Sequence, residues 1–507
     1  MTDAKIRSLD ELKVICEERK ALGQRVVLCH GVFDLLHIGH IKHLEAARKQ
    51  GDVLVVTVTP DHFVNKGPGR PVFNEVLRAE AIAALSWVDY VAINRWPTAV
   101  ETIRLLRPNL YVKGQEYVDA VQDITGKISD EEAAVTEVGG RLAFTHEVTF
   151  SSSHIINRHE SFLSKEARDY LAAFSSRYSV ADVRALFDKA ESLKVLVVGE
   201  AIIDEYQYCT AIGKSSKEPT LVVKNLSSEK FAGGILAVGN HVSGFCRNVT
   251  LLSVLGDLNP QEEYVRSGLR SNIQPILLRR KDAPTIVKRR LIESYFFTKM
   301  IEVYEINDLD LDEEDNRRFC AALREQVAAH DLVIVVDYGH GLLSHEAIGI
   351  LSSGSKFLAV NAQANAGNLG YHTISMYPRA DYVTMTEGEI RLEARSRRGD
   401  LKSMVKRVAD QLSCKRLVVT RGSNGCLCYD PKSEFVAVPA FAGRVVDRIG
   451  AGDAFLSVSS LCAVQGAPLD VIGFVGNAAG ARAVATVGNA APIERIPLLK
   501  QIETLMK

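Results

Sequence analysis

The sequence predicts an α/β protein in which two units are each built on a parallel β-sheet. Two observations carry this prediction: apolar, buried-type strands alternate with helical patterns in both halves, and a polar, helix-prone stretch separates the halves. The length of 507 residues allows two to four domains at a soft prior of about 150 residues each. We therefore expect folded units over residues 1–160 and 193–507, joined by a helical connector over 161–192.

The periodic pattern of the N-terminal half starts with an apolar strand over 25–29. A Gly-containing loop, a helix over about 37–50 and a second apolar strand over 53–58 follow. A strand, a helix and a strand at this spacing imply parallel pairing, because the crossover is long enough to hold a helix. The other elements predicted here are helices over 75–85 and 98–106 and strands over 90–93, 110–112 and 148–156.

The C-terminal half opens on a buried-type strand over 194–199. Two segments, 206–226 and 285–304, are β-rich or alternate in polarity, and they predict a small β insertion. Helical patterns separate the later apolar strands, which lie over 332–337, 357–360, 382–385 and 416–420. This order predicts a second parallel sheet covered by helices.

Composition excludes several classes of protein. The chain has 61 Lys and Arg against 62 Asp and Glu, so its formal net charge of −1 gives no overall basic footprint for nucleic acid. The N-terminus lacks the apolar core of a signal peptide, and no apolar run approaches the roughly 18 residues of a membrane span. Nine cysteines without a Cys-x-x-Cys pair predict reduced, packed thiols. We expect a cytoplasmic protein without nucleic-acid or membrane partners.

A pair of histidines marks the first candidate site. His37 and His40 lie three residues apart at the start of a predicted helix, so both imidazoles share one face, and Gly39 leaves room for a ligand against the backbone. A helix N-terminus attracts phosphate oxygens, and two histidines there can donate hydrogen bonds to charge that builds on a phosphoryl group. The alternative is two ordinary surface histidines. Their position after a buried strand and a Gly-containing turn favours a phosphate site.

Residues 31–40 resemble the His-x-Gly-His signature of the cytidylyltransferase-like nucleotidyltransferases, and the likeness extends over about residues 22–158. The later matching segments are 66–72, Arg78, 112–117 and a serine turn at 151–153. The resemblance implies a Rossmann-like domain in which an acceptor phosphate attacks the α-phosphate of a nucleoside triphosphate and pyrophosphate leaves. Positioning and charge neutralisation dominate such chemistry.

The same resemblance implies roles for individual residues. Those implied for catalysis are His37, His40 and Lys66. Those implied for nucleotide or phosphate binding are Gly31, Phe33, Asp34, Gly39, Lys113, Ser151, Ser152 and Ser153. Arg70 and Arg78 fit a functional role and a structural ion pair equally well. Mg²⁺ is expected as the counter-charge of the triphosphate, which is ATP or CTP.

A glycine-rich motif, residues 450–453, marks the second candidate site and precedes an apolar helical stretch. Gly450 and Gly452 allow tight backbone at a helix start, so consecutive N–H groups can point at an anion. Asp453 follows at once, where it can accept a proton from an attacking hydroxyl while the amides receive a γ-phosphate. The alternative is a Gly-rich turn followed by an Asp that the helix dipole favours.

This segment resembles the C-terminal signature of the ribokinase-like carbohydrate kinases, and the likeness spans about residues 193–495. Among these kinases it most resembles the kinase half of the bifunctional heptose-7-phosphate kinase/heptose-1-phosphate adenylyltransferases, with the order of the two halves reversed. The resemblance implies that Asp453 is the catalytic base. Nucleotide-site residues implied are Thr420, Gly422, Gly450, Ala451, Gly452 and Asn477. Substrate-site residues implied are Asp204, Gly233, Gly234, Lys288, Arg290 and Asp337, with Glu389 acting indirectly on metal-bound phosphate.

Three positions depart from the pattern of that family. Ala237 stands in place of an Asn of the sugar site, Thr386 in place of the Asn of an Asn-x-x-Glu element, and Asn361-Ala362 in place of Asp-Pro. The first change removes a polar group from a site that is read by hydrogen bonds, and such a change can alter substrate choice strongly. The changes also fit a weakened kinase, although the intact motif at 450–453 argues against an inactive one.

The resemblance implies a bifunctional enzyme of nucleotide-sugar synthesis. One half would phosphorylate heptose 7-phosphate with Mg·ATP, and the other would join a sugar 1-phosphate to a nucleotide, giving an ADP-heptose for lipopolysaccharide. Two alternatives stay open: a CTP-dependent alditol- or glycerol-phosphate transferase fused to another sugar kinase, and a transferase with a non-catalytic kinase-like module. The resembled kinases pair through β lids, so a homodimer through about 206–226 and 285–304 is expected.

Overall fold

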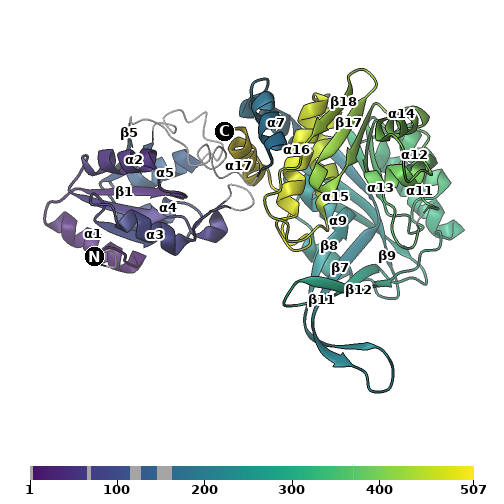
Figure 1. Cartoon of the computed structure of the whole chain (residues 1–507), viewed down its shortest axis with the longest axis horizontal. Coiled ribbons are helices and arrows are strands. Elements are labelled where there is room, and N and C mark those ends of the chain that lie inside the picture. The colour runs from purple at the N-terminus through teal and green to yellow at the C-terminus, as the bar shows by residue number, and fades with distance from the viewer. Residues whose placement is uncertain (1–3, 65–69, 115–126, 146–162, 369) are drawn as a thin grey trace. The chain divides into compact units, whose positions relative to one another are not determined.

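The computed structural model describes residues 4–64, 70–114, 127–145, 163–368 and 370–507. The chain forms two compact units, one over residues 1–164 with 499–507 and the other over 165–498 (Figure 1). Both have an α/β fold, which confirms the predicted fold class. The strand and turn predicted over 148–156 lie outside the described residues.

The smaller unit contains a five-stranded sheet in the order β3-β2-β1-β4-β5, and every neighbouring pair is parallel. Its strands are β1 Val26–Gly31, β2 Val53–Val58, β3 Tyr90–Ile93, β4 Leu110–Gly114 and β5 Arg141–Thr145. Its helices are α1 Leu9–Ala21, α2 Ile38–Arg48, α3 Glu75–Ala83, α4 Val100–Leu106 and α5 Lys127–Glu137. Val27 and Cys29 join one buried cluster while Val26 and Leu28 join another, so both faces of the sheet are covered.

The larger unit contains a nine-stranded sheet in the order β10-β9-β6-β13-β14-β15-β16-β17-β18. The strands are β6 Lys194–Gly199, β9 Asn248–Gly256, β10 Ile273–Arg280, β13 Leu332–Asp337, β14 Leu358–Ala362, β15 Tyr382–Thr386, β16 Arg416–Thr420, β17 Cys426–Asp430 and β18 Glu434–Val438. Pairing is parallel from β10 to β16 and antiparallel for the last two strands. The carboxyl ends of the parallel strands therefore meet at one edge, where the turn after β13 and the glycines after β16 lie.

Helices cover both faces of this sheet. Those of the larger unit are α7 Lys165–Ser175, α8 Val180–Ala190, α9 Ile235–Ser243, α10 Glu262–Gly268, α11 Glu313–Val327, α12 His345–Gly354, α13 Glu387–Glu393, α14 Leu401–Gln411, α15 Ala451–Val464 and α16 Leu469–Ala483, and α17 Arg495–Met506 closes the chain. One face packs on α11, α12, α13 and α14 through a large apolar core. On the other face α15 packs on α8, α9 and α16, and it is apolar on all sides because it is buried on all sides.

The segment predicted as a connector contains α7 and α8. The ring of Phe174 stacks on that of Phe474 with centroids 4.2 Å apart, and Phe187 meets Phe245 edge-on at 4.9 Å. Both helices therefore pack within the larger unit.

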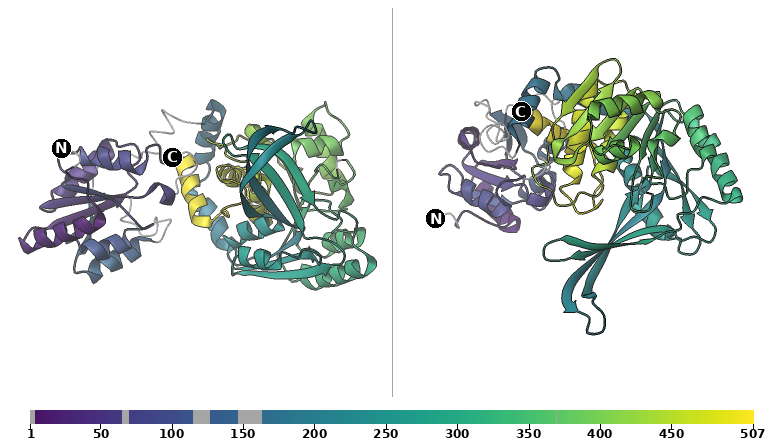
Figure 2. Two further views of the ribbon diagram at one scale, coloured as in Figure 1. Left: turned by 90° about the horizontal axis from the view of Figure 1, so that it is seen from below. Right: turned by 45° about the vertical axis from the view of Figure 1, so that its right-hand side comes forward.

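A second, four-stranded sheet forms the predicted β insertion. Its order is β12-β11-β7-β8, with β7 Ala201–Lys214, β8 Leu221–Gly234, β11 Ile286–Glu293 and β12 Thr298–Glu305. Figure 2 shows the hairpin of β7 and β8 reaching away from the rest of the larger unit. We call this four-stranded sheet the lid.

In the described part of the chain, no helix is long and apolar enough to cross a membrane. All nine cysteines are buried and none forms a disulfide. Cys426 and Cys428, two residues apart on β17, bring their Sγ atoms to 3.7 Å of each other inside the core.

Candidate active sites

Asp453 lies in the first turn of α15. The residue before that helix, Gly450, has a φ of 82°, and a Cβ there would stand 2.0 Å from the Oδ1 of Asn489. Glycine is therefore required both for the left-handed backbone and for the close approach. The turn leaves the first N–H groups of α15 beside the Asp453 carboxylate, the arrangement that receives an anion next to a base.

Among the described residues, one polar side chain, that of Tyr338, forms hydrogen bonds with the Asp453 carboxylate. The hydroxyl of Tyr338 donates to its Oδ1 at 3.1 Å and to its Oδ2 at 3.3 Å. Burial raises the pKa of Asp453 to about 6, the Tyr338 hydroxyl lowers it, nearby Asp204 raises it, and the Lys288 ammonium lowers it. A carboxyl with this pKa is mostly ionised at neutral pH. Its pKa is also close enough to 7 for the carboxylate to accept a proton efficiently.

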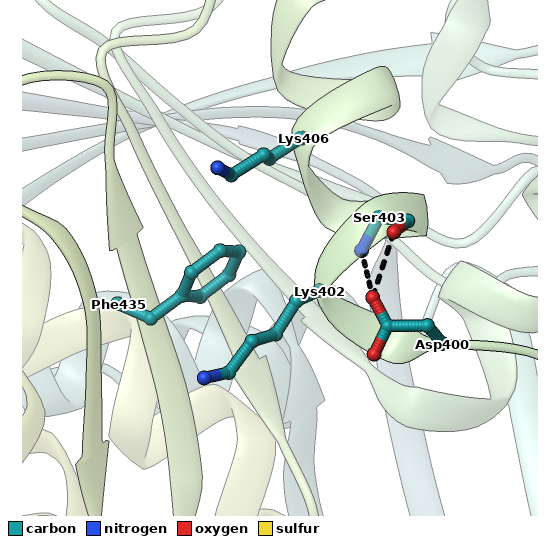
Figure 3. Close-up of a pocket in the computed structure, with 5 residues that line it drawn as sticks. All are labelled: Asp400, Lys402, Ser403, Lys406 and Phe435. Carbon is teal, nitrogen blue, oxygen red and sulfur yellow. Dashed lines mark hydrogen bonds between the residues drawn. The ribbon is translucent and has the colours of Figure 1, made fainter.

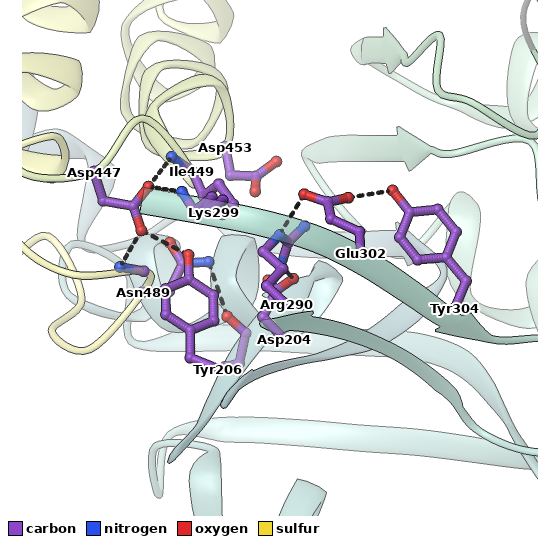
Figure 4. A network of polar contacts seen from close by, with 12 residues as sticks. Asp204, Tyr206, Arg290, Lys299, Glu302, Tyr304, Asp447, Ile449, Asp453 and Asn489 are labelled. Atoms are coloured by element: carbon purple, nitrogen blue, oxygen red, sulfur yellow. Dashed lines mark hydrogen bonds and ion pairs between the residues drawn. The ribbon is translucent and has the colours of Figure 1, made fainter. Parts of the chain in front are cut away.

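The predicted substrate residues Asp204 and Arg290 lie side by side in the lid (Figure 4), and the charge of Asp204 acts on Asp453. Arg290 on β11 pairs with Asp204 on β7, and its Nε donates to Glu302 on β12 at 2.9 Å. A Cβ on Gly233 would lie 2.4 Å from the Oδ2 of Asp204, so only glycine admits that carboxylate. The next residue, Gly234, has a φ of 54° and starts α9.

Lys288 is buried between two aromatic rings. Its ammonium lies 4.8 Å from the centroid of the Tyr338 ring and 5.0 Å from that of Tyr304. Burial lowers the pKa of Lys288, and the charge of Asp204 opposes that shift. This places a cation of the lid between the predicted sugar residues and the base.

Asp337 shapes the turn that carries Tyr338. Its carboxylate accepts from the Tyr377 hydroxyl at 2.7 Å, from the N–H of Gly339 at 3.0 Å and from the Nε2 of His372 at 2.8 Å. Burial lowers the pKa of His372, but the bond and charge of Asp337 outweigh burial and raise it overall. Among the described residues, Asp337 therefore contacts Tyr377, Gly339 and His372, and these contacts fix the turn that carries Tyr338.

The predicted nucleotide-side residues Asn477, Thr420 and Gly422 lie within α16, at the end of β16 and in the turn after β16. The Nδ2 of Asn477 on α16 donates to the carbonyls of Val438 and Pro439, each at 3.1 Å. Thr420 ends β16, and Gly422 follows it with a φ of 56°. These contacts fix the loop after β18 against α16, next to the glycines after β16.

Glu389 sits in a capping box at the start of α13. Its carboxylate accepts from the N–H of Thr386 at 2.7 Å and from that of Ala364 at 3.1 Å. Burial raises the pKa of Glu389 against the effect of these bonds. No group of three or more His, Cys, Asp or Glu with metal-site geometry occurs among the described residues.

The departure at Ala237 leaves Asn240, three residues further along α9, as the nearest amide in the sequence. Ala237 is buried in α9, and the side chain of Asn240 forms hydrogen bonds with the end of α10 and the loop after it. Its Nδ2 donates to the carbonyl of Gly268 at 2.9 Å, and its Oδ1 accepts from the N–H of Arg270 at 3.1 Å. Asn240 therefore does not replace the missing amide of the sugar site.

Sequence reasoning missed a network that joins the lid to the loop before α15. The buried carboxylate of Asp447 accepts from Lys299 on β12, from the Tyr206 hydroxyl at 2.6 Å and from the N–H groups of Ile449 at 3.2 Å and Gly488 at 3.0 Å (Figure 4). Burial raises the pKa of Asp447, but these donors outweigh it and lower it overall. Lys299 and Tyr206 stand far from Asp447 in sequence, and no local pattern links them.

In the smaller unit, the two predicted histidines lie side by side. His37 is the N-cap of α2, and its Nδ1 accepts from the N–H of Gly39 at 3.1 Å. The rings of His37 and His40 stack with centroids 3.9 Å apart, and Phe33 meets His40 edge-on at 5.4 Å. The predicted shared face is therefore present at the helix start.

Asp34 and Arg78 are buried and hold the loops around these histidines. The Oδ1 of Asp34 accepts from the N–H of Val72 at 2.9 Å, and Arg70 lies 3.6 Å from its Oδ2. Arg78 donates to the carbonyls of Phe73 at 2.9 Å and Thr59 at 2.8 Å. These contacts support the structural alternative for Arg78.

Lys113, at the end of β4, pairs with Glu131 of α5 at 2.9 Å, and both side chains are largely buried. Part of its charge is therefore balanced within the unit. The other predicted residues of this site, Lys66, Ser151, Ser152 and Ser153, lie outside the described residues.

A separate pocket of the larger unit is lined by Asp400, Lys402, Ser403, Lys406 and Phe435 (Figure 3). The ammonium groups of Lys402 and Lys406 lie 5.3 and 5.7 Å from the centroid of the Phe435 ring. Asp400 is the N-cap of α14, and its carboxylate accepts a hydrogen bond from the N–H of Ser403 at 2.9 Å. None of these residues is predicted to act in either site.

The parallel sheet, the β lid and an Asp at the glycine-rich start of a buried helix define a class of sugar kinase. Residues 192–496 match the pfkB family of carbohydrate kinases, and the chain belongs to that family. The same fold occurs in phosphofructokinase-2 from Escherichia coli in complex with potassium, at 15% identity and a TM-score of 0.50, over 62% of this chain and 100% of that one.

The N-terminal part has relatives of its own. Residues 28–158 match the family described as cytidylyltransferase-like. The bifunctional protein HldE of Geobacter metallireducens is 41% identical over 163 residues, which are 31% of this chain and 31% of that protein. The bifunctional protein HldE of Aliarcobacter butzleri is 38% identical over 143 residues, 28% of this chain and 30% of that protein. These alignments span about a third of each relative, and the predicted order, transferase-like region before kinase region, is confirmed.

Proposed function

We propose that the chain is a bifunctional transferase of nucleotide-sugar synthesis, with a sugar kinase in the larger unit and a nucleotidyltransferase in the smaller one. The observation that carries the kinase is the position of Asp453 beside free N–H groups at the start of α15, within reach of the cluster of Asp204, Lys288 and Arg290. Membership of the pfkB family and the relatives named bifunctional support the pairing of the two activities.

The kinase step follows from this geometry. A substrate hydroxyl donates its proton to the Asp453 carboxylate while its oxygen forms a bond to the γ-phosphorus of ATP. The bond from that phosphorus to the bridging oxygen breaks, and ADP leaves. The N–H groups at the start of α15 receive the charge on the transferring group. Asp204 and Arg290 are placed to hold the sugar hydroxyls, and Lys288 supplies positive charge next to them.

The transferase step uses the stacked histidines. An oxygen of the acceptor phosphate attacks the α-phosphorus of the nucleoside triphosphate, and pyrophosphate leaves. His37 and His40 donate hydrogen bonds to the oxygens of the triphosphate as its negative charge is redistributed. Lys66, Lys113 and Ser151–Ser153 complete this site in the proposal.

Both steps involve triphosphates, for which Mg²⁺ supplies counter-charge when bound. Glu389 is the carboxylate predicted near metal-bound phosphate, and its oxygens already accept hydrogen bonds from two backbone N–H groups. The residues present therefore fit a metal ion that the protein contacts only indirectly. A metal held mainly by phosphate and water oxygens is the usual mode for Mg²⁺.

The sugar that we propose is heptose 7-phosphate, and the product of the two halves is an ADP-heptose. A second candidate is another sugar phosphate combined with CTP in the transferase half. Ala237 favours a different sugar for the kinase half, because the site lacks the amide that would read one hydroxyl and Asn240 is committed elsewhere.

A coupled screen tests the proposal. The whole chain is incubated with sugar phosphates and alditol phosphates, with ATP or CTP and Mg²⁺, and the products are identified by mass. We expect ADP formation that depends on a sugar phosphate, and pyrophosphate release that depends on a sugar 1-phosphate. If pyrophosphate release occurs with CTP and not with ATP, the product is a CDP-linked compound and the ADP-sugar assignment is wrong. No phosphoryl transfer to any sugar would leave the larger unit as a binding module.

A further inference from the structure

Tyr338 makes the only side-chain hydrogen bonds to the Asp453 carboxylate that involve described residues. We propose that Tyr338 is a positioning residue for the kinase step, whose hydroxyl orients the Asp453 carboxylate and keeps it ionised until the substrate hydroxyl arrives. This inference rests on the proposed kinase function and adds to it a residue that has no role in the reaction as proposed above.

The backbone of Tyr338 is held from both sides. Its N–H donates to the buried carboxylate of Glu200 at 3.0 Å, and the same carboxylate accepts from the N–H of His340 at 3.0 Å. Its carbonyl accepts from the Nδ2 atoms of Asn365 and Asn368, each at 2.6 Å. Four hydrogen bonds from three buried or half-buried side chains thus fix the backbone of the turn over residues 338–340.

The ring of Tyr338 is held as well. It is 6% exposed, and the Lys288 ammonium sits over its face at 4.8 Å from the centroid. Burial raises the pKa of Tyr338 well above its usual value, so the hydroxyl keeps its proton and acts as a donor at all physiological pH values. A donor fixed in this way favours the charged form of the carboxylate that it meets.

The shared hydrogen bond also sets the direction of the carboxylate. Tyr338 spans both oxygens of Asp453 at nearly equal distance, so rotation of the carboxylate about its Cβ–Cγ bond would lengthen at least one contact. The remaining lone pairs stay available for the proton of the substrate hydroxyl. In the transfer step the substrate proton moves to Asp453, and Tyr338 keeps its own proton throughout.

The charged groups that act on Asp453 are Asp204 of β7, which raises its pKa, and Lys288 of β11, which lowers it. Titratable groups on other elements packed against α15 have partners elsewhere: Asp188 with Arg495, His241 with the N–H of Ile493, Asp337 with His372, and Asp470 with Arg177. Tyr382 of β15 donates to Ser459. Replacing Tyr338 by Phe therefore removes a hydrogen bond that lowers the Asp453 pKa, and it adds or removes no charge near Asp453.

The test is Tyr338→Phe, with Tyr382→Phe as its matched control. Both variants remove one buried tyrosine hydroxyl of the larger unit, but that of Tyr382 donates to the Ser459 hydroxyl at 2.7 Å and not to Asp453. We expect Tyr338→Phe to move the acidic limb of the kcat profile to higher pH by about one unit and to lower kcat about twofold at pH 7 and about tenfold near pH 5, because the carboxylate loses a hydrogen bond that favours its charged form. Tyr382→Phe should leave the limb where it is in the wild type.

A second readout does not depend on turnover. The pKa of Asp453 is followed by NMR on protein labelled with ¹³C at aspartate carboxyls, and Asp453→Asn identifies its signal. A rise of the Asp453 pKa in Tyr338→Phe, with no rise in Tyr382→Phe, supports the inference. An unchanged Asp453 pKa in a folded Tyr338→Phe protein would overturn it. Absence of kinase turnover in the wild type would instead overturn the proposed kinase function, and the NMR titration would still decide the contact between the two side chains.

Discussion

At the scale of single residues, the kinase assignment depends on one carboxylate in an unusual setting. Asp453 is partly removed from water, and burial outweighs the Tyr338 hydroxyl and the Lys288 charge, so its pKa rises to about 6. Proton acceptors are most useful when their pKa lies near the working pH. A solvated Asp would be a weaker base at neutral pH, so the burial is part of the chemistry.

This pKa gives a pH prediction. Because the base works in its ionised form, kcat of the kinase should fall as the pH drops through about 6. The folded-state pKa is also above the unfolded one, so the stability that this group contributes is present below the unfolded pKa and is lost as the pH rises through about 6. Asp453→Asn should therefore remove the kinase activity and, at pH 7, be at least as stable as the wild type. Urea unfolding checks this, with the exposed Asp410→Asn as control, and clear destabilisation of Asp453→Asn alone would contradict it.

Residue-level chemistry was partly visible in the sequence. The histidine pair and the Gly-x-Gly-Asp motif are local, and the structure places each at a helix start as predicted. Glu200, Tyr338 and Lys299 were missed as contributors, because their contacts are made across the fold: Glu200 with the N–H of Tyr338, Tyr338 with Asp453, and Lys299 with Asp447. Long-range pairing of this kind leaves no spacing pattern in one sequence.

At the scale of elements, the apolar strands of both sheets were predicted because a strand buried on both faces is a continuous apolar run. Helix α5 and strand β5 were missed. Four of the five residues of β5 are only half-buried or exposed, as expected of an edge strand, and its sequence lacks a strong apolar run. The lid was predicted only as a β insertion, since register and partner strands depend on how β7 and β11 pair.

The junction between β8 and α9 gives an element-scale prediction. Gly233→Ala places a methyl 2.4 Å from the Oδ2 of Asp204, so Asp204 must shift and its pairing with Arg290 weakens. We expect KM for the sugar to rise about tenfold or more, with the nucleotidyltransferase activity unchanged. The control is Gly349→Ala in α12, where an added Cβ meets nothing within 4 Å. Equal sugar affinity in both variants would exclude the role proposed for Asp204.

The contact of Lys299 with Asp447 gives a second prediction at the scale of elements. Lys299→Met leaves the buried Asp447 carboxylate without its charged partner, although Tyr206 and two N–H groups remain. We expect the free energy of unfolding of the larger unit to fall by about 1–3 kcal/mol, the usual cost of weakening the solvation of a buried charge. Lys214→Met, on the exposed end of β7, is the control, and equal unfolding curves for the two variants would refute the role of this ion pair.

At the scale of the whole molecule, the near-neutral charge of the chain does not conflict with two phosphate-handling sites. The positive charge that they need is local, from Lys288, Arg290, Lys113 and the starts of α2 and α15. The order of the two regions and the family of the larger one followed from sequence motifs, whereas the predicted domain boundaries at 160 and 192 stay a prediction. What the chain acts on is decided by buried polar groups such as those around Ala237, and one sequence does not reveal their pairing.

The lid leads to a prediction about assembly. Its strands carry the exposed apolar side chains of Ile212, Leu221, Leu226, Ile301 and Val303, each at least 44% exposed. We propose that this surface pairs with the lid of a second copy, because exposed apolar β surface is costly to leave in water. Sedimentation at micromolar concentration should give twice the mass of the chain, and Leu221→Glu should reduce it. A monomeric wild type would remove the proposal.

The proposed presence of two independent phosphate chemistries on one chain can be tested by substituting each site separately. Its most direct test measures both reactions, sugar-dependent ADP formation and sugar-1-phosphate-dependent pyrophosphate release, in the wild type, in Asp453→Asn and in His40→Asn. We predict that Asp453→Asn loses the first reaction by at least about 100-fold and keeps the second, and that His40→Asn shows the reverse. Loss of both reactions in either folded variant, or their absence from the wild type with every sugar phosphate tried, would contradict this account.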